Sequence, residues 1–164
     1  MAESVVVEEW DSSHPHWPEL MHAVDALDQT RWVTIPYEWA HSSHILVALS
    51  GTDIAGFLRF VVQDIGAEDG HDPVKMDGRA LTEAKVLAFG VSPENRRQGI
   101  GRHIQVALLE RAGTLGCYQV RSHSSGENSA NHRLKLSMGY AVHPVIRGED
   151  RGGVYFVKAI ESTS

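Results

Sequence analysis

The sequence predicts a single α/β domain built on a mixed β-sheet, over residues 1–164. A length of 164 residues is that of one ordinary domain, and a composition with 42% hydrophobic and 22% charged residues is typical of a globular protein. No repeat, low-complexity tract or linker divides the chain. After residue 80 the strand and helix patterns alternate, which favours a sheet that is partly parallel.

The first half of the chain shows mostly strand patterns. Residues 4–10 are rich in β-branched side chains and predict a strand. Residues 18–29 have apolar side chains three or four positions apart, so they predict an amphipathic helix. Residues 44–50 and 54–63 flank a Gly-Thr-Asp turn and predict a β-hairpin. The acidic stretch 64–80, interrupted by Gly and Pro, predicts a long loop, and such loops are often functional.

The second half alternates between the two patterns. We expect strands at 81–91, 117–123, 140–146 and 153–160, and helices at 102–116 and 128–138. The apolar residues of the longer helix share one face, and Gly113 and Gly116 give the signals that end it.

Charge and composition exclude several classes of protein. The net charge of −6 argues against a non-specific nucleic-acid binder, which needs a basic surface. No apolar run approaches the roughly eighteen residues of a membrane span. The first residues lack the basic start and apolar stretch of a secretory signal, so we expect a cytoplasmic protein. The single cysteine, Cys117, has apolar neighbours, which predict a buried thiol rather than a nucleophile.

Residues 91–104, VSPENRRQGIGRHI, place glycines and positive charge at the start of a predicted helix. The first N–H groups of a helix have no partner within it, so they bind phosphate readily. Gly99 and Gly101 leave room for a phosphate beside the main chain. The positive charge comes from Arg96, Arg97 and Arg102. This pattern predicts a phosphate-binding loop; the alternative is a tight turn with solvated arginines.

Two common nucleotide-binding motifs do not fit. The sequence has no Gly-x-x-x-x-Gly-Lys-Ser/Thr run, and Ile104 stands where a dinucleotide fingerprint needs its third glycine. The Arg-x-x-Gly-x-Gly pattern after a strand ending in Val-Ser-Pro instead resembles motif A of the GNAT superfamily, the acetyl-CoA-dependent N-acetyltransferases. The resemblance covers about residues 81–143, and the earlier half matches only in the order of its elements.

The resemblance implies a GNAT-like fold, with a mixed, mostly antiparallel central sheet that has a parallel strand pair at the coenzyme site and is flanked by helices. It also implies acetyl-CoA as cosubstrate and no metal. In the family the pantetheine arm runs along the strand before the loop, here at Phe89 and Val91, where a strand amide can form an oxyanion hole. The coenzyme pyrophosphate lies on the backbone of the loop, here Arg97, Gln98, Gly99, Ile100, Gly101 and Arg102, with Arg96 beside it.

The second helix of the resemblance carries two candidate residues. Asn128 aligns with a helix-start asparagine that contacts pantetheine in relatives, and it is equally suited to cap the helix. Relatives often have a tyrosine four residues before the glycine of the final Gly-Phe/Tyr pair, where it protonates the leaving thiolate. Counting back from Gly139 gives Lys135. An ammonium there can stabilise the thiolate or donate a proton; the alternative is a solvated lysine or one that binds a coenzyme phosphate.

An amine acceptor must lose its proton before it attacks, so a general base is expected. Glu83 and Lys85 lie on the same face of strand 81–91, and relatives often place a glutamate on this strand, closest in register to Lys85. Glu83 is the candidate base, and a surface ion pair with a lysine is the alternative. His123, at the end of the next strand, is a secondary candidate.

The acceptor side has weaker signals. All four tryptophans lie in the first quarter of the chain and predict either core packing or an aromatic wall for a cation or an apolar amine. The acidic residues of loop 64–80 either cover the acceptor cleft or are solvated; they include Glu68, Asp69, Asp72 and Asp77. The ten histidines lack the spacing of a zinc site, so we expect no metal.

The sequence therefore predicts an N-acetyltransferase that moves an acetyl group from acetyl-CoA to an unidentified primary amine by direct attack, with Glu83 and Lys135 as catalytic candidates. The acceptor is a small molecule or a peptide, and partners are neither nucleic acid nor membrane. A homodimer is considered because dimers are the commonest assemblies. Two alternatives are a non-catalytic acyl-CoA-binding module, because the usual tyrosine is Lys135, and a histidine-rich metal-binding or interaction domain.

Overall fold

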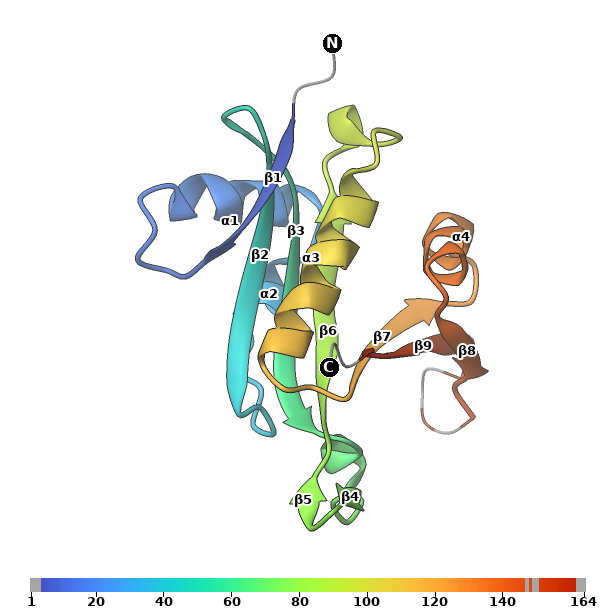
Figure 1. The fold of residues 1–164 in the computed structure, drawn as a ribbon. Helices are drawn as coiled ribbons and strands as arrows, with labels where there is room; N and C mark the ends of the chain where they lie inside the picture. Colours follow the sequence, from blue (N-terminus) through green and yellow to red (C-terminus); the bar gives the residue numbers. More distant parts are fainter. Residues whose placement is uncertain (1–3, 147, 149–150, 162–164) are drawn as a thin grey trace.

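A seven-stranded sheet runs through the protein in the order β1-β2-β3-β6-β7-β9-β8, and β4 pairs with β5 in a separate two-stranded sheet (Figure 1). The computed structural model describes residues 4–146, 148 and 151–161. The strands of the large sheet are β1 (Val5–Trp10), β2 (Ser42–Ser50), β3 (Asp53–Asp64), β6 (Thr82–Val91), β7 (Gln119–Ser125), β8 (Ala141–Pro144) and β9 (Gly153–Ala159). The small sheet holds β4 (Lys75–Met76) and β5 (Arg79–Ala80). The helices are α1 (Trp17–Ala26), α2 (Thr30–Thr34), α3 (Ile100–Thr114) and α4 (Ser129–Ser137), with short 3₁₀ turns at Ala67–Asp69 and Pro93–Asn95.

The large sheet is mostly antiparallel, with one parallel pair formed by β6 and β7. Their register runs from Glu83–Gln119 to Lys85–Arg121. Beyond these pairs β6 continues along β3 as far as Val91, while β7 continues along β9. The two strands therefore separate, and β7, β9 and β8 diverge from the rest of the sheet in Figure 1. The predicted fold class, with its parallel strand pair, is confirmed.

Helices cover both faces of the sheet. The apolar residues of α3, including Ile104 and Leu108, are fully buried against one face. Leu20 and Val24 of α1 pack in a second core cluster with Phe57 of β3, which lies on the other face. The helical spacing seen in the sequence thus reflects real buried stripes, since residues four apart lie on one side of a helix.

Several boundaries differ from the sequence prediction. The long helix begins at Ile100 rather than at residue 102, because Gly99 adopts a left-handed conformation (φ 78°) and the helix starts directly after it. The loop at 64–80 contains the β4–β5 hairpin, which turns at Asp77 and Gly78 with φ of 51° and 79°. An Asp-Gly pair is a strong hairpin signal, and it was visible in the sequence. The short helix α2 was not predicted.

Among the described residues, none of the helices has the length and apolar character needed to traverse a lipid bilayer.

Candidate active site

A cleft of about 1120 Å³ lies where β6 and β7 separate. Its walls come from β6, from the turn before α3, from the far part of β7 and from the start of α4. Because β6 and β7 are no longer paired there, β6 presents one edge of its backbone to this cleft. A strand edge of this kind can hydrogen-bond an extended ligand through its main-chain groups.

The turn before α3 is shaped for close approach of a ligand to the backbone. Gly99 and Arg97 both have positive φ, at 78° and 66°, so the chain reverses within a few residues and enters the helix. A Cβ on Gly101 would lie 3.3 Å from side-chain atoms of Leu134 and Phe89, so a larger residue there would push against α4 and β6. The first N–H groups of α3 therefore lie at the cleft with little side-chain cover.

Most of the predicted coenzyme residues border this cleft. They are Phe89, Val91, Arg96, Arg97, Gly99, Ile100, Gly101 and Asn128. Of the other two, Gln98 lies in the same turn and Arg102 at the start of α3, and both side chains have other contacts. Gln98 donates to the backbone carbonyl of Glu94 at 3.3 Å, and the Arg102 guanidinium donates to the Ser137 hydroxyl at 2.7 Å.

Asn128 caps α4. Its side-chain Oδ1 accepts a hydrogen bond from the backbone N–H of Asn131 at 3.2 Å, while the residue also borders the cleft. The predicted cap is therefore present. We expect Asn128→Ala to lower the free energy of unfolding by about 1 kcal/mol in urea denaturation, because an orphan N–H loses its acceptor. Asn128→Asp keeps the acceptor and should keep the stability; an equal loss in both variants would contradict the capping role.

Lys135 is a buried ammonium at the base of the cleft. Its side chain is 1% exposed, and Nζ donates to Oε1 of the buried Gln105 of α3 at 2.9 Å. Nζ also lies 4.6 Å from the ring centroid of Tyr140. Burial lowers the pKa of Lys135 from 10.5 to about 7, so the group is easily deprotonated near neutral pH. Lys135 is therefore not the solvated helix lysine that was considered as an alternative.

Glu83 lies at the paired end of β6 and β7, fully buried. Its carboxylate accepts hydrogen bonds from Gln63 at 2.8 Å and from Gln119 at 2.9 Å, and it pairs with Arg121 Nη2 at 3.0 Å. Burial raises the pKa of Glu83, while the two amide donors oppose that shift. Glu83 is therefore in an ion pair, but not in the surface pair with a lysine given as the alternative: its partner is an arginine and the pair is buried.

A second carboxylate completes this cluster from the acidic loop. Glu68, in the turn Ala67–Asp69, forms ion pairs with both Lys85 and Arg121. The Tyr37 hydroxyl donates to Glu68 at 2.9 Å and accepts from Lys85 Nζ at 3.1 Å. Burial raises the pKa of Tyr37 to about 12, so its proton stays in place. Of the acidic loop residues, Glu68 borders the cleft, whereas Asp69, Asp72 and Asp77 are exposed.

His123 and Cys117 lie in contrasting surroundings. His123 is exposed, borders the cleft and contacts the Tyr155 ring edge-on, with centroids 5.4 Å apart. Cys117 is 6% exposed and belongs to the main core cluster, as its apolar neighbours predict. Burial raises the pKa of the Cys117 thiol, which keeps it protonated and a poor nucleophile.

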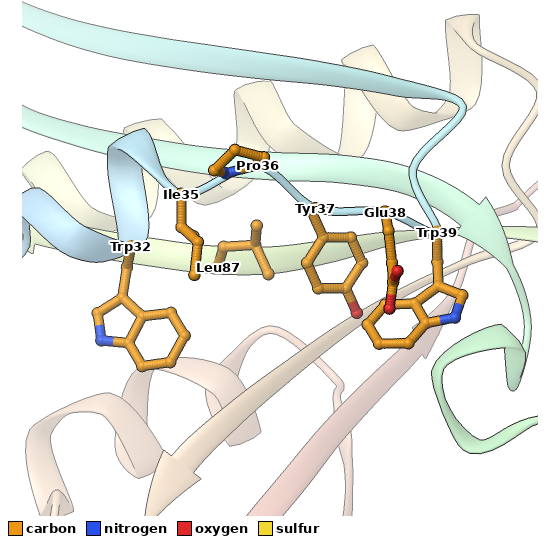
Figure 2. A pocket seen from close by; sticks show the side chains of 7 residues that line it. All are labelled: Trp32, Ile35, Pro36, Tyr37, Glu38, Trp39 and Leu87. Carbon is orange, nitrogen blue, oxygen red and sulfur yellow. The ribbon is translucent and has the colours of Figure 1, made fainter.

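A smaller pocket of about 410 Å³ adjoins the cleft (Figure 2). It is lined by Trp32, Ile35, Pro36, Tyr37, Glu38, Trp39 and Leu87. Trp32, Tyr37 and Leu87 also border the larger cleft, so the two spaces meet there. Leu87 is the residue that the register between β3 and β6 skips, at a bulge in β6. Of the four tryptophans, Trp10 is buried in the core, whereas Trp32 and Trp39 are 46% and 40% exposed.

Several histidines contact aromatic or acidic side chains. His14 stacks on Trp10, His41 pairs with Asp64, and His44 pairs with Glu9. Within the part of the chain that the structure describes, no group of three or more His, Cys, Asp or Glu side chains is arranged to hold a metal ion.

The cleft thus lies where the sheet opens between two parallel strands, beside a glycine turn at a helix N-terminus. Residues 5–140, most of the chain, match the acetyltransferase (GNAT) family, so this chain belongs to that family and is an acyltransferase by class. Among curated proteins none matches the chain.

Solved structures with the same fold have low sequence identity to the chain. NAA60 from Arabidopsis thaliana, in complex with acetyl-CoA, has a TM-score of 0.67 and 17% identity, covering 96% of this chain and 99% of that one. The ribosomal-protein-S18-alanine N-acetyltransferase from Escherichia coli has a TM-score of 0.62 and 16% identity, covering 98% and 97%. A Klebsiella pneumoniae protein assigned to the acyl-CoA N-acyltransferases has a TM-score of 0.68 and 17% identity, covering 96% and 98%.

Proposed function

We propose that this protein transfers the acetyl group of acetyl-CoA to a primary amine by direct attack. The observation that carries the proposal is the position of the cleft, which opens along the edge of β6 and ends at the turn Arg96–Gly101. The free edge of β6 suits the extended pantetheine arm of coenzyme A, and the turn before α3 suits its charged phosphate end. The family and the acetyl-CoA complex of NAA60 support the choice of ligand.

The proposed coenzyme position follows from the geometry of its two ends. The pyrophosphate lies on the first N–H groups of α3, where Gly99 and Gly101 leave the backbone accessible and Arg96 and Arg97 add positive charge. The pantetheine arm pairs with the free edge of β6 between Phe89 and Val91. This places the acetyl group toward the bulge at Leu87, where the acceptor pocket meets the cleft.

The transfer itself forms one bond and breaks another. The lone pair of the amine nitrogen attacks the acetyl carbonyl carbon, the C–N bond forms, and the C–S bond breaks with its electron pair on sulfur. A backbone N–H of β6 stabilises the negative oxygen of the intermediate. The nitrogen loses a proton to a base and the sulfur gains one. No covalent acyl-enzyme is needed, and the buried Cys117 thiol is not placed to form one.

Lys135 is the proposed partner of the leaving sulfur. Its ammonium borders the cleft, and a lowered pKa of about 7 makes it a proton donor suited to neutral pH. A positive charge in a buried site also stabilises a thiolate more strongly than it would in water. Lys135 thus takes the role that relatives give to tyrosine.

For the base, Glu83 and His123 are the two candidates. Glu83 is enclosed by three donors behind Arg121, so it reaches an acceptor only through a proton relay. His123 borders the cleft directly, and histidine is the commonest general base in enzymes. The pH dependence of kcat/KM in Glu83→Gln and His123→Gln separates them: the variant that lacks the base loses the acidic limb of the profile.

The proposed activity is tested by the release of free coenzyme A thiol from acetyl-CoA, measured with a panel of primary amines. We expect acetyl-CoA to raise the melting temperature, because at 100 times its Kd a ligand adds about 2.7 kcal/mol to the folded state. We also expect amine-dependent thiol release that follows the concentration of enzyme. Stabilisation by acetyl-CoA without thiol release for any amine would favour the non-catalytic acyl-CoA-binding module. An absence of both would contradict the proposal.

We further propose that the protein is cytoplasmic, forms a homodimer and has no nucleic-acid partner. Size-exclusion chromatography with light scattering tests the dimer.

A further inference from the structure

The pocket beside the cleft is apolar, open and held in shape. Apart from Glu38, its lining residues are aromatic or aliphatic, and Figure 2 shows Trp32 at one end and Trp39 with Tyr37 at the other. Trp32 and Trp39 are 46% and 40% exposed, which is unusual for the largest apolar side chain. Exposed tryptophans around a concave surface are a common feature of binding sites.

Arg59 fixes the segment that forms this pocket. It is 6% exposed, lies on the central strand β3, and its Nη1 donates to the backbone carbonyls of Trp32 at 3.0 Å and Ile35 at 2.7 Å. A buried guanidinium that holds two carbonyls in this way makes the loop part of the rigid sheet. The pocket is therefore preformed, and a ligand that enters it loses little affinity to ordering of the loop.

The charged groups beside the pocket are already paired. Lys85, which borders the larger cleft, would be the natural binding partner of an acceptor carboxylate, but Glu68 forms ion pairs with it and with Arg121, which borders neither space. Arg121 is in addition paired with the fully buried Glu83. Two cations and two carboxylates balance, so a further carboxylate entering here must displace Glu68 or be buried without a partner, which is costly.

We propose that the acceptor is a small primary amine with one bulky apolar group and no carboxylate beside the amine. The apolar group occupies the Trp32–Trp39 pocket, the nitrogen lies at the junction formed by Tyr37 and Leu87, and Glu68 excludes amino acids by occupying Lys85 and Arg121. The carboxylate of Glu38 on the pocket wall attracts the ammonium form of such an amine as it approaches (Figure 2). This inference rests on the proposed acetyl transfer and names its substrate class.

Three amines that share a phenyl ring test the proposal. They are 2-phenylethylamine, phenylalanine, which adds a carboxylate, and phenylalaninamide, which adds a neutral amide of similar size. A fourth, 1,4-diaminobutane, lacks the apolar group. We expect kcat/KM for 2-phenylethylamine and phenylalaninamide to exceed that for the other two by at least about tenfold, since a tenfold ratio corresponds to about 1.4 kcal/mol.

Two variants locate the effect. Trp32→Ala should raise KM for 2-phenylethylamine by about tenfold, because it removes aromatic contact and apolar burial from the pocket. Tyr118→Ala is its control, because Tyr118 is 44% exposed and borders neither space. Glu68→Gln frees Lys85 and Arg121 from one carboxylate, so it should raise the ratio of kcat/KM for phenylalanine to that for 2-phenylethylamine about tenfold.

Binding is measured separately by calorimetry, with each amine titrated into protein saturated with coenzyme A. This readout does not depend on catalysis and shows whether a folded variant still takes the amine. Preference for phenylalanine or for 1,4-diaminobutane, or rejection of phenylalaninamide together with phenylalanine, would overturn the inference. So would a Glu68→Gln variant that binds 2-phenylethylamine normally and gains no phenylalanine activity. If acetyl-CoA neither binds nor releases thiol with any amine, it is the proposed function that fails.

Discussion

Replacing Lys135 with methionine should make the stability of the protein much less dependent on pH. Burial lowers the pKa of Lys135 from 10.5 to about 7, so below pH 10.5 the unfolded chain holds more protons than the folded one. The destabilisation caused by burying the Lys135 ammonium is therefore fully present below pH 7, and it disappears as the pH rises toward 10.5. Between pH 6 and pH 9 the native protein should gain about 3 kcal/mol from this group, and Lys135→Met should lose that gain.

Urea denaturation across this pH range measures the effect. At pH 7 the variant should be equal to or more stable than the native protein, although Gln105 loses a hydrogen-bond donor, which costs about 1–3 kcal/mol. Lys75→Met is the matched control, because Lys75 is exposed on β4 and its loss removes one ammonium from a solvated position. If both variants follow the pH dependence of the native protein, then the pKa of Lys135 is not lowered in the folded state, which would contradict its proposed role as a proton donor suited to neutral pH.

The double variant Arg97→Glu, Gly99→Glu should bind acetyl-CoA at least about a hundredfold more weakly. It places two carboxylates where a pyrophosphate is proposed to lie, and it puts a side chain at a position with φ of 78°. At a concentration 100 times the Kd of the native protein, acetyl-CoA adds about 2.7 kcal/mol to the native fold and should add almost none to the variant. Thermal melts with and without the coenzyme measure the difference.

The β4–β5 hairpin offers a matched control for this pair. Gly78 also has a left-handed conformation, with φ of 79°, a side chain added there would extend into open space, and Arg79 beside it is exposed. Gly78→Glu, Arg79→Glu therefore introduces the same strain and the same change of charge away from the cleft. Equal stabilisation of the control and of the Arg97 variant by acetyl-CoA would show that the turn before α3 does not hold the coenzyme.

Local features of the site could be predicted from sequence because they depend on neighbours along the chain. The glycine turn, the long helix after it and the cap at Asn128 each follow from a few consecutive residues. The strand–helix–strand order predicts that β6 and β7 are parallel, because a helix between two strands returns the chain to the starting edge of the sheet.

The rest depends on contacts between distant segments. The ionic cluster brings together side chains from four separate segments, namely Tyr37, Glu68, Lys85 and Arg121. The sequence around each of them gives no sign that they are partners. From sequence alone Lys135 is an ordinary helix lysine. Its burial depends on the packing of α3, which places Gln105 within hydrogen-bonding distance of it. The exposure of Trp32 and Trp39 likewise depends on where Arg59 holds their segment.

The parallel pairing between β6 and β7 ends at Lys85 and Arg121, the same two residues that hold Glu68. The point at which the sheet forks is therefore filled by long charged side chains and by a carboxylate from a distant loop. The vertex of the fork and the charged part of the cleft are therefore the same place, so a substitution at Lys85 or Arg121 acts at once on the end of the strand pairing and on the charge balance beside the cleft.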